Sequence, residues 1–180
     1  MTAIEPGARA RRPQMAALAL SCLIWLAVPA AAQETPTVEV RGAVKTALRL
    51  DADALGRFPA ESIGSFTQSR RADGGESAST VRGVLLTALL DRAALAGKDR
   101  HDWKKSVVVA TASDGYRVVF SWPELFNTPA GASVLVVFER DGQPLGAQEG
   151  RIALVSGGDQ RTGPRHVRWL QTLDVRVLGE

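Results

Sequence analysis

Short valine-rich runs, each closed by a tight turn, constrain the fold of this chain more than any other feature. Residues 106–112 (SVVVATA) and 133–140 (SVLVVFER) are apolar enough for buried strands, and both are too short for typical helices. The turn signals Ser113-Asp114-Gly115 and Asp141-Gly142 follow them directly. Residues 117–121 (RVVFS) follow the first of these turns and predict a hairpin partner for the first run. The pattern favours a chain dominated by antiparallel strands.

Further strands are predicted by alternating or continuous apolar residues. They cover residues 37–41, 47–50, 63–68, 152–156 and 167–177, and Trp169 in the last of them is expected to lie in the core. The polar, glycine-bearing stretch 70–79 (RRADGGESAS) predicts a loop. Together these segments predict a single β-rich α+β domain.

Three helices complete the expected elements. The strongest covers residues 84–95, with Gly97 placed to end it. A short helix is expected after Asp51 or Asp53, either of which suits an N-cap. Another is expected at Pro123, with Ser121 as its cap.

The N-terminus has the pattern of a secretory signal. Three arginines precede a 14-residue apolar run, Met15 to Val28, and small residues at 30–32 follow it. That run is shorter than the ~20 residues of a membrane-spanning helix, although a retained anchor is the alternative. We expect a cleaved signal peptide at 1–32, a ligand-binding domain at 33–180 and a periplasmic location.

Charge and cysteine content exclude several classes of function. The net charge of +3 includes Arg9, Arg11 and Arg12 against Glu5, so the rest of the chain carries +1. Nucleic-acid binding needs a concentrated positive surface, and none is predicted. The only cysteine is Cys22, within the predicted signal, so neither disulfides nor a metal–thiolate site are expected in the mature chain. Without cysteine, a zinc site would need His101, His166 and a carboxylate, and these residues lack ligand spacing. No motif fixes the geometry of a hydrolytic triad, so neither a metal site nor a catalytic residue is predicted.

The densest polar cluster is GGDQRTGPRHVR, residues 157–168. Its donors, suited to an anion or a planar carbonyl, are Arg161, Arg165, His166 and Arg168. The alternative is a solvated loop whose arginines pair with nearby acids. Tyr116 and Trp122, with Phe66, are aromatic residues that suit stacking on a flat heterocycle. Burial in the core is the alternative for each of them.

These segments, in their order and spacing, resemble the molybdopterin-binding domain of the sulfite oxidase family. The segments that carry the resemblance are VEVRG (38–42), residues 58–68, GVLLTALL (83–90), ASDGYRVVF (112–120), RDGQPL (140–145) and GPRHVRWLQTL (163–173). The resemblance covers nearly all of residues 33–180. It implies a β-rich α+β fold, which agrees with the periodicity.

One family feature is missing. Molybdenum enzymes of the family carry a metal-ligating cysteine just after the second strand, where this chain reads IGSFTQSRR (63–71), with Gln68 and Ser69 near the expected place. Neither an amide nor a neutral hydroxyl replaces a soft thiolate ligand. The chain is more similar to a small exported branch that lacks this cysteine. That resemblance implies a reduced simple pterin as ligand and a membrane-bound cyclic-di-GMP enzyme, contacted through its periplasmic region, as partner.

The expected ligand-binding residues follow from this resemblance and from the polar cluster. They are Phe66, Gln68, Ser69, Tyr116, Trp122, Arg161, Arg165 and His166. Three functions remain open from the sequence: a noncatalytic periplasmic pterin-binding sensor, a molybdopterin-dependent oxidoreductase subunit that holds the molybdenum cofactor without a cysteine, and an interaction scaffold that binds only a protein partner.

Overall fold

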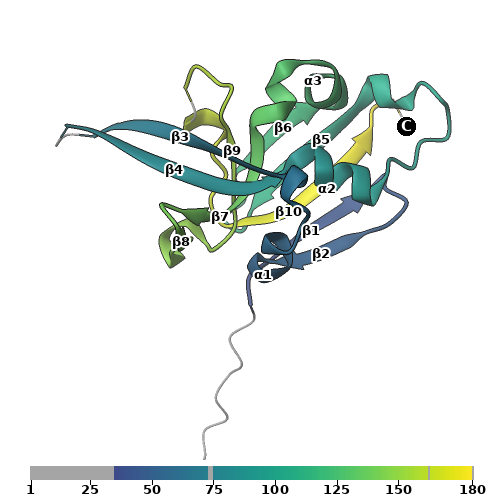
Figure 1. Cartoon of the computed structure of the whole chain (residues 1–180). Coiled ribbons are helices and arrows are strands. Elements are labelled where there is room, and N and C mark those ends of the chain that lie inside the picture. The colour runs from purple at the N-terminus through teal and green to yellow at the C-terminus, as the bar shows by residue number, and fades with distance from the viewer. Residues whose placement is uncertain (1–34, 73–74, 162, 180) are drawn as a thin grey trace, which may run out of the picture. The chain divides into compact units, whose positions relative to one another are not determined.

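Two five-stranded sheets form the framework of the domain (Figure 1). The computed structural model describes residues 35–72, 75–161 and 163–179. The first sheet has the order β2 (Leu48–Asp51), β1 (Thr37–Gly42), β10 (Leu170–Val177), β5 (Ser106–Ala112) and β6 (Arg117–Ser121). The second has the order β3 (Ile63–Ala72), β4 (Gly75–Leu85), β7 (Val134–Arg140) and β8 (Gln143–Pro144), with β9 (Ala153–Ser156) also paired to β7.

Alternation of side chains determines which face of the first sheet is buried. Val38 and Val40 in β1 are fully buried, as are Leu173 in β10 and Val108 in β5. The residues between them point to the opposite face, because side chains alternate along a strand. β1 and β10 are parallel, whereas the other neighbours in this sheet are antiparallel. One face therefore closes the core and the other is free to carry polar residues.

The main core lies between the two sheets and includes a helix. Val136 and Leu154 from the second sheet join Val40 and Val108 from the first in one buried cluster. Helix α2 (Leu86–Ala93) buries Leu86, Leu89, Leu90 and Ala93 in the same cluster. The helix predicted at 84–95 is thus confirmed, but it is shorter, because residues 84 and 85 still belong to β4.

The two short helices begin at the predicted caps. Asp51 caps α1 (Ala52–Gly56) by accepting a hydrogen bond from Ala54 N at 2.7 Å. Ser121 caps α3 (Trp122–Asn127) by accepting one from Glu124 N at 3.1 Å. Five short 3-10 helices lie at 60–62, 102–105, 129–133, 147–149 and 163–165. Among the described residues, no helix has the length and apolar character needed to cross a membrane.

The predicted loop at 70–79 is wrong, because both strands of a hairpin continue through it. β3 and β4 pair from Ile63↔Val84 to Ala72↔Gly75. β4 pairs with β7 only over residues 81–85, so the rest of the hairpin extends as a two-stranded arm beyond the sheet (Figure 1). The stretch 70–79 contains no alternation of apolar and polar residues, so its sequence lacks the signal that identifies a strand. The predicted β-rich α+β class is confirmed.

Candidate functional site

A polar cleft of about 990 Å³ lies where the base of the arm meets the loops that follow β7 and β9. Its lining comes from β3 and β4, from the end of β7, and from residues 149–168. The residues that line this polar cleft are Phe66, Thr67, Gln68, Ser69, Ser77, Ser79, Arg140, Glu149, Gly157, Asp159, Gln160, Arg161, Gly163, His166 and Arg168. Three arginines against two carboxylates make its polar groups slightly cationic.

Arg140 connects both sides of the polar cleft. Its guanidinium makes a bidentate pair with Glu149, with Nε–Oε1 at 2.8 Å and Nη2–Oε2 at 2.9 Å. The remaining Nη1 donates to Ser79 Oγ at 2.5 Å and to Gln68 Oε1 at 3.4 Å. Gln68 and Ser79 are cross-strand neighbours in the arm. One fixed arginine therefore ties the hairpin to the 147–149 turn, which defines the shape of the cleft.

His166 presents a buried and unsatisfied nitrogen to this cluster. Its Nε2 lies 3.3 Å from Glu149 Oε2, but without the alignment of a hydrogen bond, and within the described residues it has no other partner. Burial lowers the pKa of His166, while the Glu149 carboxylate acts in the opposite direction. Burial by itself raises the pKa of Glu149, but the Arg140 guanidinium outweighs it, so the pKa lies below the usual value. The cleft thus holds a neutral imidazole beside a carboxylate.

This imidazole should make stability depend on pH. Because the pKa of His166 is lower in the folded state than its ordinary 6.5, the folded chain binds fewer protons, and stability falls as pH drops below 6.5. We expect His166→Gln to reduce the loss of unfolding free energy between pH 7.5 and 5.5 by up to about 1.4 kcal/mol, the limit set by the uptake of one proton over the single pH unit below 6.5. Urea denaturation at both pH values measures this. His101→Gln is the control and should lose as much unfolding free energy as wild type. An equal loss in wild type and His166→Gln would contradict the prediction.

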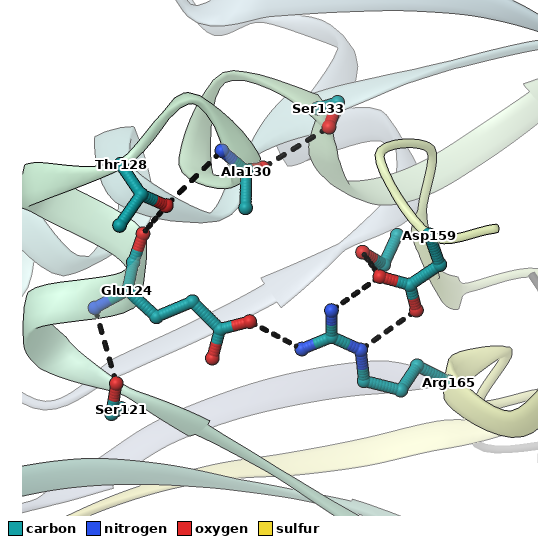
Figure 2. A network of polar contacts seen from close by, with 8 residues as sticks. Ser121, Glu124, Thr128, Ala130, Ser133, Asp159 and Arg165 are labelled. Carbon is teal, nitrogen blue, oxygen red and sulfur yellow. Dashed lines mark hydrogen bonds and ion pairs between the residues drawn. The ribbon is translucent and has the colours of Figure 1, made fainter.

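Arg165 does not line the polar cleft, and its guanidinium is paired with two carboxylates instead. Figure 2 shows its guanidinium between Asp159 and Glu124. It donates from Nε to Asp159 Oδ2 and from Nη1 to Glu124 Oε1, each at 2.7 Å, and a further bond joins Nη2 to Asp159 Oδ1. It also lies 4.7 Å from the centre of the Phe120 ring. Hydrogen bonds from Arg165 lower the pKa of Asp159 and keep it charged.

The structure brings five of the eight sequence-predicted site residues to one cleft. Phe66, Gln68, Ser69, Arg161 and His166 all line it. The Phe66 ring also packs against the backbone of Gly157, where a Cβ atom would lie 2.7 Å from the ring, so a glycine is required there.

The other three predicted residues do not line the polar cleft. Trp122 is 8% exposed and belongs to the main core, and its ring stacks on the exposed Phe126 ring with centres 4.7 Å apart. Tyr116 is exposed, and its hydroxyl donates to Pro164 O at 2.6 Å. Arg165 is held by its two carboxylates.

Sequence reasoning missed Arg140 and Glu149, an ion pair that lines the cleft. Arg140 is the last residue of β7, whose first five residues are all buried. A charged residue at the end of such a strand is a sequence signal for a functional or paired side chain. Glu149 lies in a short turn after β8, and nothing local marks it. Within the ranges that the structure describes, no three His, Cys, Asp or Glu side chains gather as a metal site.

Two sheets around one core, with a polar cleft beside the second, define a domain of the α+β class that is suited to hold a small ligand. The chain belongs to the family described as the oxidoreductase molybdopterin binding domain, whose model matches residues 25–177. No curated protein matches it significantly.

Among solved structures, the chain is similar to the sulfane dehydrogenase SoxCD from Paracoccus pantotrophus. The TM-score is 0.57 at 18% sequence identity, and the match covers 80% of this chain and 39% of that chain. A likeness at this identity shows a shared fold. This chain therefore spans well under half the length of that structure.

Proposed function

We propose that this chain is a noncatalytic pterin-binding protein of the periplasm that reports its ligand to a membrane-bound cyclic-di-GMP enzyme. The observation that carries the proposal is the polar cleft, which offers hydrogen-bonding groups for a heterocycle and no thiolate for a metal. Membership of a molybdopterin-binding family supports a pterin-type ligand.

The residues of the cleft suit the edges of a pterin ring. Such a ring has N–H donors on one edge and a carbonyl and ring nitrogens as acceptors. Glu149 can accept from the donor edge, while Arg161 and Arg168 can donate to the carbonyl. The unsatisfied Nε2 of His166 gains most from a ligand, because a buried polar atom without a partner costs about 1–3 kcal/mol.

The cleft does not fit molybdenum. In this family the metal is held by a thiolate near the position of Gln68 and Ser69, and the only cysteine, Cys22, lies outside the described residues. Gln68 faces Arg140 as a hydrogen-bond acceptor, and an amide oxygen is a hard ligand. The donor set supports a metal-free ligand, and we derive no oxidoreductase step for this site.

A sensor role requires export and a partner that distinguishes the bound from the free form. The N-terminal arginines and the short apolar run that follows support export, and Gln33–Glu180 would then be the mature chain. A bound pterin shifts a receptor only if the two forms of this protein bind the receptor with different affinities. Arg140 joins Glu149 to Gln68 and Ser79 in the arm, so a ligand that changed these hydrogen bonds would change the surface that the receptor contacts.

The proposal predicts a ligand that depends on His166. Native mass spectrometry of the protein purified from the periplasm should show a small added mass without a molybdenum isotope pattern. His166→Ala should lose it, because affinity falls about tenfold or more when a buried hydrogen-bonding group is removed. His101→Ala, at an exposed histidine outside the cleft, is the matched control.

Three results would contradict the proposal or redirect it. A molybdenum pattern would restore the oxidoreductase function. Retention of the added mass by His166→Ala would place the ligand elsewhere. Bare wild-type protein that also fails to bind added tetrahydropterin in a calorimetric titration would leave the interaction scaffold as the better description.

A further inference from the structure

A second cavity of about 770 Å³ lies on the outer face of the first sheet. It runs across β2, β1, β10, β5 and β6 and is bounded by residues 147–151. Its charged lining is mostly basic: Arg41, Arg49, Arg117, Arg151 and Arg176. We call it the arginine groove. Two acids, Glu39 and Asp174, also line it, so it carries a net charge of three positive units.

Only part of this charge is neutralised within the groove. Arg176 donates to Asp174 at 2.7 Å, and the long Glu39–Arg41 pair, at 3.6 Å, joins two exposed side chains. Arg117 and Arg151 have no carboxylate partner among the described residues, and both are exposed. Concentrated positive charge of this kind is available to an anionic partner.

One wall of the groove is held in a strained conformation. Arg151 and Trp169 both have positive φ, 65° and 49°, although neither is glycine. Such backbone costs about 1–3 kcal/mol per residue and persists where the surroundings enforce it. Here Trp169 Nε1 donates to Ala147 O at 3.0 Å, and the Trp169 ring lies against Gly150, where any Cβ would overlap it. The prediction that Trp169 lies in the core is wrong, since 38% of it is exposed.

The same wall also borders the polar cleft. The wall consists of two segments, residues 149–151 and residues 168–169. In residues 149–151, Glu149 lines the cleft, whereas Gly150 and Arg151 line the groove. In the second, Arg168 lines the cleft and Trp169 lines the groove. Trp169 N donates to Glu149 O at 2.9 Å and joins the two segments. A change in the cleft therefore has a short, covalently continuous route to the groove.

We propose that the arginine groove docks an extended, acidic segment of a protein partner, with Trp169 as an aromatic contact beside the arginines. Carboxylates complement Arg117 and Arg151, and bidentate pairing favours arginine for this purpose. The acids within the groove and its concave shape disfavour a uniformly anionic membrane or nucleic acid. A second copy that docked through its own arginine groove would present like charges. The chain's own N-terminus is also basic, with Arg9, Arg11 and Arg12.

The biological meaning of this docking rests on the proposed sensor role, but the docking itself can be tested without pterin. The probe is a fluorescein-labelled heptapeptide that alternates Glu with Val, and its counterpart alternates Lys with Val. Fluorescence anisotropy with protein expressed from the full chain should show binding of the Glu peptide alone. Arg117→Glu with Arg151→Glu should weaken that binding at least tenfold, and added salt should weaken it in wild type.

The control is the pair Lys45→Glu and Arg57→Glu, which makes the same charge change at exposed residues outside both cavities and should alter affinity less than twofold. If the groove double variant fails to show the wild-type circular dichroism spectrum, Arg117→Gln replaces it, with a smaller loss expected. Equal weakening by the control pair, equal binding of the Lys peptide, or no binding at 1 mM Glu peptide would overturn the proposal.

Sedimentation with phosphatidylglycerol vesicles distinguishes a membrane from a protein partner. Vesicle binding that needs Arg117 and Arg151, with no peptide binding, would also overturn the proposal in favour of a lipid surface. Peptide binding by a protein that takes up no tetrahydropterin would instead contradict only the proposed pterin function.

Discussion

Replacing Arg165 with alanine should lower the free energy of unfolding by about 2–3 kcal/mol. The substitution removes charge-assisted hydrogen bonds to Asp159 and Glu124 and leaves both carboxylates without their cation. Each such bond contributes about 1.5–3 kcal/mol, and the pairs are partly exposed, since 25% of the Arg165 side chain is accessible. Urea denaturation followed by circular dichroism measures the change.

Arg161→Ala is the matched control for this prediction, because Arg161 lies in the same loop and is exposed. It should change stability by less than about 0.5 kcal/mol. Equal stability of Arg165→Ala and wild type would show that the network in Figure 2 contributes little. Arg165→Lys should recover only part of the loss, since an ammonium cannot reproduce the bidentate contact with Asp159.

Arg140→Met should destabilise the protein by about 2–4 kcal/mol at pH 7. Methionine keeps the length and apolar stem of the side chain, but it leaves Glu149 charged, with only 20% of its side chain exposed, and without its bidentate partner. The double variant Arg140→Met with Glu149→Gln should recover much of that loss, because the unpaired charge is then gone. A double variant less stable than Arg140→Met alone would contradict this.

Acidification should reduce the cost of Arg140→Met. In wild type the pKa of Glu149 lies below its ordinary 4.5, so the carboxylate contributes stability above that pH and loses it as pH falls through the folded value. Without Arg140, burial raises the folded pKa above 4.5, so the variant regains stability as pH falls through that raised value. The difference between the two proteins should therefore narrow from pH 7 to pH 4.

Strand-forming segments were predictable because their signal is local. Val-rich β5 and β7 and their turns, and the caps Asp51 and Ser121, depend on residues adjacent in sequence. The outer part of the β3–β4 arm was not predictable, because the stretch RRADGGESAS (70–79) has no alternation of apolar and polar residues. Trp169 was misjudged for a related reason: alternation predicts a buried face but not a left-handed backbone that turns the ring outward.

The site was predictable only in part, because partners distant in sequence decide which side chains remain available. Arg165 and His166 are adjacent and equally polar in the sequence. The fold then pairs Arg165 with Glu124, 41 residues away, and leaves His166 Nε2 without a hydrogen-bond partner in the described part of the chain. Arg140 and Glu149 were missed for the same reason, since Arg140 joins Glu149 to Gln68 and Ser79, which are distant from it in sequence.

The wall shared by the polar cleft and the arginine groove couples the affinity of the cleft for its ligand to the occupancy of the groove. Binding linkage is reciprocal, so the factor by which an occupied cleft tightens docking in the groove equals the factor by which docking tightens the ligand. If the proposed pterin tightens docking of the proposed receptor, a receptor-bound copy of this protein would lose that ligand at a lower surrounding concentration than a free copy. The signal would then persist after the ligand concentration falls, for a time set by the rate of ligand release from the docked complex.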